Sequence, residues 1–162
     1  MSSVAADAGA GRVETRGGAA PLTRMGIAVL SLVGLFIAAY LLLHRLGIVG
    51  ALACGADGGC AVVQSSRWAV FLGIPVPAWG VVGYGLLFGA SLAAVQPGLV
   101  GDRRIAAVLF GLSAFAFGFS LYLTALEAFV IHAWCRWCLA SAGIATAIFV
   151  LSLPEIRRLR RG

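Results

Sequence analysis

The run MGIAVLSLVGLFIAAYLLL at residues 25–43 contains no charged residue and lies between Arg24 and Arg45. About 20 apolar residues in a helix span the roughly 30 Å hydrocarbon core of a bilayer, so this run predicts a membrane-spanning helix. Three more uncharged runs of similar length follow, at residues 77–95, 105–126 and 137–153. The sequence therefore predicts an all-α integral membrane protein with a bundle of four transmembrane helices.

The composition of the whole chain agrees with this class. Of the 162 residues, 61% are hydrophobic and 11% are charged, against roughly 45–50% and about 25% in soluble globular proteins. Such a chain has too few polar side chains to cover its core in water, which excludes a soluble enzyme, a disordered chain and a small disulfide-dense secreted protein. The net charge of +6 comes from arginines that form no continuous patch, so no nucleic-acid partner is expected.

Composition also divides the chain into three segments. Residues 1–22 are rich in Ala, Gly and Ser and predict a disordered cytoplasmic leader. Residues 23–154 hold the four-helix membrane domain, and residues 155–162 form a basic cytoplasmic tail. The first apolar run is long for a signal peptide and lacks a clear cleavage site after it, so we expect it to be retained.

The arginines predict the orientation. Four spans place both termini on one side, and nine of the twelve arginines fall on that side. These nine are Arg12, Arg16, Arg24, Arg103, Arg104, Arg157, Arg158, Arg160 and Arg161. The positive-inside rule then predicts that both termini lie in the cytoplasm; if the membrane is a bacterial inner membrane, the outward face is oxidising. The loops at residues 44–75 and 129–133 face outward.

All four cysteines lie in or beside these outer loops. Cys54 and Cys60 are separated by five residues, three of them glycine, and such a pliant segment can bring either sulfur to a new partner. A disulfide closing so short a loop would be a weak structural staple. The first pair therefore favours a mobile redox role, with a structural disulfide as the alternative.

The second pair is the C-x-x-C motif Cys135-Arg136-Trp137-Cys138 at the outer end of the fourth span. At a helix start, free amide hydrogens and the helix dipole favour thiolate, and Arg136 adds positive charge. In an oxidising compartment, two such pairs describe a disulfide relay. Because no nucleotide, flavin or haem motif is visible, a membrane quinone is the expected electron acceptor. The alternatives are a zinc-binding adaptor and a non-catalytic tetraspan scaffold with two structural disulfides.

Two longer segments carry a family resemblance: VVQSSRWAVFLGIPVPAWGVVGY at residues 62–84 and YLTALEAFVIHAWCRWCLASA at residues 122–142. With the preceding C-x5-C spacing they resemble bacterial members of the vitamin K epoxide reductase family, over about residues 25–153. The resemblance implies a four-helix bundle around a quinone, ubiquinone or menaquinone, with the cysteine-bearing outer loops capping one end. It implies an oxidoreductase that supports disulfide-bond formation by oxidising a separate, exported thioredoxin-like (DsbA-like) protein.

The resemblance also implies roles for individual residues. Cys54 takes electrons from the thioredoxin-like partner, and Cys60 then attacks Cys135. Cys138 faces the quinone. Ser66 matches a family serine or threonine near the reaction centre, where its hydroxyl could donate to a quinone oxygen; capping a helix end is the equally favoured alternative.

Further matches concern the quinone pocket. Trp79, Gly80 and Tyr84 match the start of the second core helix, where an aromatic ring could lie against the quinone; anchoring at the membrane interface is the alternative. Vertebrate members have an asparagine and a tyrosine where this chain has Val76 and Ala142. Neither replacement can hydrogen-bond a substrate, so the resemblance favours quinone reduction over epoxide reduction.

A rival family differs from this chain in the order of its cysteine pairs. The four-helix disulfide-bond oxidases typified by the B component of the bacterial Dsb system carry their C-x-x-C before the wider pair, and the order here is the reverse.

Glu127 is the acid nearest to the spans, where an acid is a functional candidate by default. We interpret it instead as an interfacial acid paired with Arg136 or Arg67.

Overall fold

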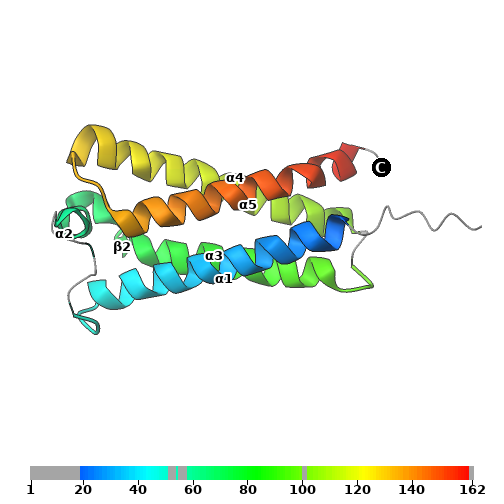
Figure 1. Cartoon of the computed structure of the whole chain (residues 1–162), viewed down its shortest axis with the longest axis horizontal. Helices are drawn as coiled ribbons and strands as arrows, with labels where there is room; N and C mark the ends of the chain where they lie inside the picture. The colour runs from blue at the N-terminus through cyan, green and yellow to red at the C-terminus, as the bar shows by residue number, and fades with distance from the viewer. Residues whose placement is uncertain (1–18, 51–53, 55–57, 100–101, 161–162) are drawn as a thin grey trace, which may run out of the picture.

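A computed structural model describes residues 19–50, 54, 58–99 and 102–160. Within these residues, four helices are long and apolar enough to cross a membrane, which confirms the predicted four-span architecture. They are α1 (Ala19–Arg45), α3 (Val76–Val95), α4 (Arg103–Leu126) and α5 (Arg136–Arg160). The four lie side by side along the long axis, and the C-terminus lies at the end opposite to the short helix α2 (Figure 1).

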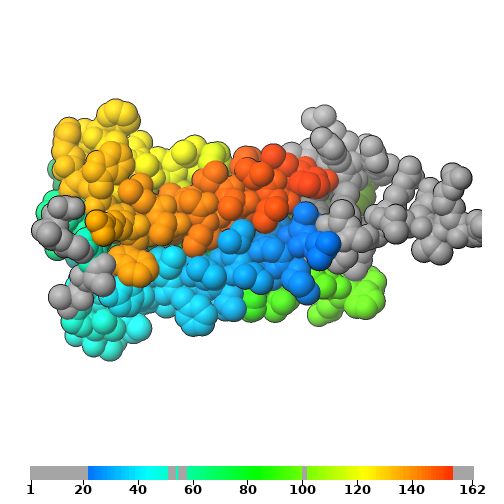
Figure 2. Space-filling model, in the orientation of Figure 1, coloured from blue at the N-terminus to red at the C-terminus, as the bar shows by residue number. Residues whose placement is uncertain are grey.

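The helices form a closed ring. The first helix, α1, packs against α3 and α5, and α4 packs against the same two neighbours. Figure 2 shows the face on which α1 and α5 run beside each other along the bundle. Each helix contributes one fully buried aliphatic side chain to the central core: Ile27, Leu87, Leu109 and Ile148, all at most 1% exposed. In a bilayer the lipid tails are as apolar as these side chains, so van der Waals packing between the helices, rather than exclusion of water, holds the ring together.

One close helix–helix approach depends on a glycine. The ring of Tyr84 on α3 lies directly against Gly34 on α1, where an added Cβ would collide with three ring atoms. The Tyr84 hydroxyl donates a hydrogen bond to the Ser141 carbonyl oxygen on α5, 2.8 Å away, and lies 2.9 Å from the Ser141 hydroxyl. Tyr84 therefore connects three of the four helices.

Short elements cover the end of the bundle away from the C-terminus. They are α2 (Gly59–Ser65), the 3-10 turn η2 (Arg67–Ala69), and a two-residue hairpin of β1 (Val70–Phe71) and β2 (Ile74–Pro75). Val70 pairs with Pro75 and Phe71 with Ile74 in antiparallel register. The sequence predicted loops capping this end, but it did not predict α2 or the hairpin within them.

Two helix boundaries differ from the prediction. Helix α1 begins at Ala19, inside the segment expected to be disordered; residues 1–18 of that segment lie outside the described residues. Helix α5 continues through Pro154 to Arg160, although the sequence predicted its end at Pro154. A proline removes one backbone hydrogen bond and crowds the preceding turn, but the helix absorbs this near its end.

Arg24 was counted as an arginine on the cytoplasmic side, but its side chain is only 1% exposed. Its Nη1 donates a hydrogen bond of 2.6 Å to the carbonyl oxygen of Ala94, in the last turn of α3. The last carbonyls of a helix lack partners within it, and a cation there also interacts favourably with the helix dipole. Arg24 is thus a buried cap for α3.

Candidate redox site

The four cysteines gather in one place. Cys54, Cys60 and Cys135 are buried in one cluster with Val63, and Cys138 packs against it. Cys54 and Cys60 form a disulfide with their Cα atoms 5.9 Å apart, whereas Cys135 and Cys138 are free. The fold therefore brings together two pairs that are 75 residues apart in the sequence, from Cys60 to Cys135.

A glycine allows the two pairs to meet. Gly59, the first residue of α2, lies so close to Trp134 that an added Cβ would collide with the Trp134 carbonyl oxygen. The preceding residue, Gly58, has a φ of 60°, in the left-handed region that favours glycine. These two glycines let α2 press its first turn, which carries Cys60, onto the segment that leads into Cys135.

The C-x-x-C pair forms the beginning of α5. The carbonyl oxygen of Cys135 accepts the hydrogen bond from the amide of Leu139, at 2.9 Å, and the Cys135 sulfur accepts one from the amide of Cys138, at 3.3 Å. The Cys138 thiol also donates to the Cys135 sulfur, with the two sulfurs 2.6 Å apart. Since a disulfide bond measures about 2.05 Å, this pair needs little movement to close.

These contacts lower the pKa of Cys135 below the ordinary value of a thiol. The largest cause is the hydrogen bond from the Cys138 thiol, which stabilises the Cys135 thiolate. Burial and the nearby charge of Glu127 oppose this effect. Arg136, which the sequence analysis expected to contribute, has an exposed side chain and is not among the causes.

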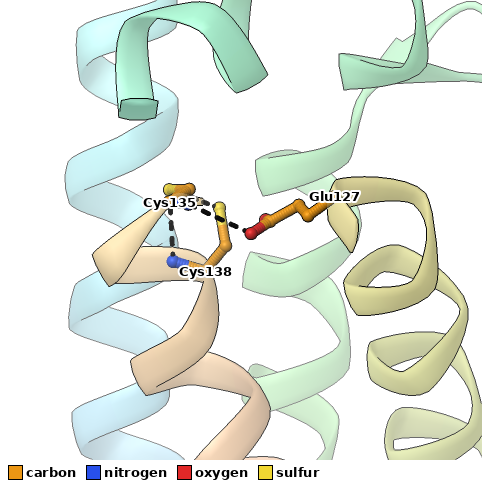
Figure 3. A group of neighbouring side chains, drawn as sticks. All are labelled: Glu127, Cys135 and Cys138. Carbon is orange, nitrogen blue, oxygen red and sulfur yellow. Dashed lines mark hydrogen bonds between the residues drawn. The ribbon is translucent and has the colours of Figure 1, made fainter. Parts of the chain in front are cut away.

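Glu127 was predicted to pair with Arg136 or Arg67 at the interface, and that prediction is wrong. Its side chain is 3% exposed, and its Oε2 accepts a hydrogen bond of 3.0 Å from the amide of Cys135. Figure 3 shows Glu127 pointing from the end of α4 toward both inner cysteines. One of its carboxylate oxygens and the two sulfurs lie within 4.8 Å of one another.

The local backbone explains this position of Glu127. Helix α4 ends in a π turn, η3 (Glu127–Ile131), followed by His132 in the left-handed conformation with a φ of 54°. This conformation is uncommon for a residue other than glycine. The wider turn and the abrupt stop turn the chain back toward α5, and place the carboxylate beside Cys135 rather than at the surface.

A large apolar cavity adjoins the inner pair. It has a volume of about 460 Å³, and Cys138, Glu127 and Ser66 contribute to its wall. Most of the rest of its lining is apolar or aromatic, including Leu41, Phe71, Val76, Trp79, Tyr84, Leu112, Phe119 and Ala142. Its volume is within the range of about 300–1,000 Å³ for small-molecule sites, and its walls come from helices of the bundle.

The residues that the resemblance assigns to the quinone pocket, Ser66, Trp79, Gly80 and Tyr84, all line this cavity. The three with polar side chains also make structural hydrogen bonds. The Ser66 hydroxyl donates to the Val63 carbonyl oxygen at 2.8 Å, at the end of α2. The Trp79 ring nitrogen donates to the Phe71 carbonyl oxygen at 3.2 Å, which ties α3 to the hairpin. Tyr84 makes the contacts to Ser141 described above. Their roles toward a quinone stay predictions.

Sequence reasoning missed two features of the site. Ser141, three residues after Cys138, carried no motif that would identify it as the partner of Tyr84. Glu127 did carry a signal, because it is a lone acid eight residues before Cys135 at the end of an apolar run. The sequence does not show that the chain turns back after Glu127 and brings the amide of Cys135 to this carboxylate.

The site consists of a buried, closely spaced dithiol and a second, disulfide-bonded pair beside it. The dithiol lies at the wall of an apolar cavity in a four-helix membrane bundle. This is the geometry of a membrane thiol–disulfide exchange site. The profile of the Vitamin K epoxide reductase family matches residues 25–153, and the chain belongs to this family. Both the family and the matched residues agree with the resemblance seen in the sequence.

The chain is also similar to the thiol-disulfide oxidoreductase LTO1 of Arabidopsis thaliana. The two are 30% identical over 109 residues, which is 64% of this chain and 29% of that protein. This chain therefore matches less than a third of the length of its relative.

Proposed function

We propose that this protein is a membrane thiol oxidoreductase that takes electrons from an exported thioredoxin-like protein and passes them to a membrane quinone. One observation carries the proposal. The outer disulfide Cys54–Cys60, the inner pair Cys135 and Cys138, and the wall of the apolar cavity adjoin one another in that order. Electrons can move along this series by direct exchange between neighbours.

The proposed chemistry balances over one cycle. A thiolate of the partner attacks Cys54, and Cys60 leaves as a thiolate; the partner's second thiol then completes its disulfide. Cys60 next attacks Cys135 of an oxidised inner pair, and Cys138 leaves. When the Cys54–Cys60 disulfide forms again, the inner pair is left as two thiols. Re-forming the inner disulfide transfers two electrons and two protons to the quinone, which becomes a hydroquinone.

The cavity supports a quinone as the electron acceptor. An apolar ring with two carbonyl oxygens suits a site with mainly apolar walls and a few polar groups. Val76 and Ala142 lie in the wall, and neither offers a hydrogen bond to a substrate. We therefore propose that the terminal step is the reduction of a quinone, either ubiquinone or menaquinone, and not the reduction of an epoxide.

We also propose a bacterial inner-membrane location with both termini in the cytoplasm and the cysteines outside. The excess of arginine near the termini supports this orientation. The C-terminus lies at the end of the bundle opposite to α2, which carries Cys60 (Figure 1). An exported DsbA-like protein would then reach the outer disulfide directly.

The structure gives less support to the two alternative functions. A scaffold with two structural disulfides would hold the inner pair closed, but Cys135 and Cys138 are free and their hydrogen bonds lower the pKa of Cys135. A zinc adaptor using all four cysteines would require Cys54 and Cys60 as separate ligands, but they are bonded to each other.

The test is quinone reduction by the purified full-length protein in detergent, with a reduced thioredoxin-like protein as donor and a short-chain ubiquinone or menaquinone as acceptor. We expect turnover by the wild type and none by Cys138→Ser. Cys138→Ser should still accept electrons at the outer disulfide, which thiol trapping and mass spectrometry would show. Full quinone reduction by the Cys138→Ser variant, or none by the wild type, would contradict the proposal.

A further inference from the structure

Glu127 is a buried carboxylate for which the electron pathway above has no use. Intramembrane acids are costly, and they mark functional sites by default. Arg67 and Arg136 are the arginines predicted to pair with it, and in the described part of the chain neither forms an ion pair with it. Its Oε2 accepts a hydrogen bond from the amide of Cys135, and its carboxylate also interacts with the Cys138 side chain. The carboxylate is therefore held at the inner pair without a neutralising cation from these arginines.

The chemistry at the inner pair needs a proton acceptor. Each time Cys135 and Cys138 re-form their disulfide, two thiol protons must leave the sulfurs. Cys135 is fully buried, and Cys138 is partly buried against the cavity. Direct release of these two protons to bulk water is thus hindered at the inner pair, where the electrons pass to the quinone.

Glu127 has the position that such an acceptor requires. Its carboxylate and the two sulfurs lie within 4.8 Å of one another, and the same side chain forms part of the cavity wall. One end of the proton path is therefore at the thiols and the other at the place where the quinone oxygen would lie. The π turn and the left-handed His132 hold the carboxylate there, and strained backbone of this kind clusters at functional sites.

We propose that Glu127 accepts a proton from the inner thiol pair as its disulfide forms, and passes it to the reduced quinone. This inference rests on the proposed function. As the Cys138 sulfur gives up its electron pair and bonds to Cys135, the two thiol protons leave the sulfurs. One of them moves to the Glu127 carboxylate and from there to a hydroquinone oxygen, which returns Glu127 to its ionised form. The second proton passes to the other hydroquinone oxygen, so the quinone takes up two electrons and two protons.

Few titratable groups surround this site in the described residues. On the C-x-x-C segment they are the thiols of Cys135 and Cys138, and α2 contributes Cys60, which is closed in a disulfide. Helix α3 contributes Tyr84 to the same cavity, with its hydroxyl bonded to Ser141. Helix α1 contributes Tyr40, whose ring packs at 5.3 Å against Trp137. A carboxylate is present in this set only at Glu127.

The decisive variant is Glu127→Gln, because an amide oxygen still accepts the hydrogen bond from Cys135 and the side chain keeps its size. We expect kcat for quinone reduction to fall by about 100-fold or more, the loss typical of a missing general base. The wild-type kcat should decline toward low pH as the carboxylate is protonated, and this decline should be absent in the Gln variant. Glu127→Asp should recover part of the rate and restore the decline.

Asp102→Asn is the matched control. It makes the same change from carboxylate to amide at the other end of the bundle, where Asp102 caps α4 by accepting from the amide of Arg104 at 2.8 Å. Asparagine is an equally good cap, so this variant should keep wild-type kcat. A second readout is the rate at which the reduced partner opens the Cys54–Cys60 disulfide without quinone. That rate should stay within about twofold in the Gln variant, which also shows that the variant is folded.

The outcomes separate the two proposals. A wild type that reduces no quinone overturns the proposed function and this inference with it. An active wild type with a Gln variant of similar kcat, or of lower kcat but unchanged pH profile, overturns only the role of Glu127 as proton acceptor. If the Gln variant does not fold, Glu127→Asp decides the matter: a measurable kcat that keeps the acid-side decline would support the inference, and a kcat without that decline would overturn it.

Discussion

The contact between Gly34 and Tyr84 gives a sharp test of the packing. Replacing Gly34 by alanine places a methyl group against the Tyr84 ring, which is 6% exposed and bonded to Ser141. The ring cannot move aside without loosening these bonds. Overpacking of this kind costs about 1–3 kcal/mol, and a lost hydrogen bond costs about 1 kcal/mol more. We expect Gly34→Ala to lower the free energy of unfolding by roughly 2–4 kcal/mol.

Gly89→Ala is the matched control for this prediction. Gly89 is an exposed glycine of α3, and an added Cβ there would meet no atom within 4 Å. Alanine is a better helix former than glycine, so this variant should be about as stable as the wild type or up to about 1 kcal/mol more stable. Both variants can be compared by reversible unfolding in mixed micelles with increasing denaturing detergent.

A double substitution isolates the cause. With Tyr84→Ala already in place there is no ring to obstruct, so adding Gly34→Ala should cost little. If Gly34→Ala is no more destabilising than Gly89→Ala, or if its cost persists in the Tyr84→Ala background, the reasoning about this contact is wrong. Because Tyr84 lines the cavity, Gly34→Ala should also raise the KM for quinone.

Two further predictions concern the exchange between the cysteine pairs. Gly59→Ala forces α2 away from the Trp134 carbonyl oxygen. Because small misplacements of reacting groups are costly, disulfide exchange between the two cysteine pairs should slow by at least about tenfold, as measured by quench-flow thiol trapping. An unchanged exchange rate would show that the close approach is unimportant. Cys138→Ala removes the largest cause that lowers the pKa of Cys135, so this pKa should rise. Alkylation of Cys135 at neutral pH should then slow about tenfold for each pH unit of the rise, and alkylation as fast as in the wild type would contradict the assignment.

Sequence patterns were sufficient for the number of spans and for the location of the cysteines. An uncharged run of some 20 residues has one stable form in a bilayer, so hydropathy predicts the helices within a few residues. The boundaries were less certain. The last candidate span ends at Pro154 as predicted, but helix α5 continues beyond it, because a proline near a helix end removes one hydrogen bond without ending the helix.

The details of the site depended on tertiary contacts that no local pattern encodes. Nothing near Arg24 in the sequence indicates that it caps a helix whose last turn lies 70 residues later. Glu127 looked like an interfacial acid because the π turn that redirects it is not visible in the sequence. The cavity lining combines residues from four helices and the hairpin, so only the assembled bundle shows that Val76 and Ala142 share a wall.

The closed ring has a consequence for the order in which the protein matures. The first helix packs against the last, and the last also supplies Cys138, Ser141 and Ala142 to the cavity wall. Because the chain is synthesised from its N-terminus, Cys54 and Cys60 are made well before Cys135 and Cys138. The Cys54–Cys60 disulfide can thus form before its partner pair exists, and the cavity is complete only once the last helix has packed against the first. Any molecule that occupies this cavity can therefore bind only after the last helix is in place.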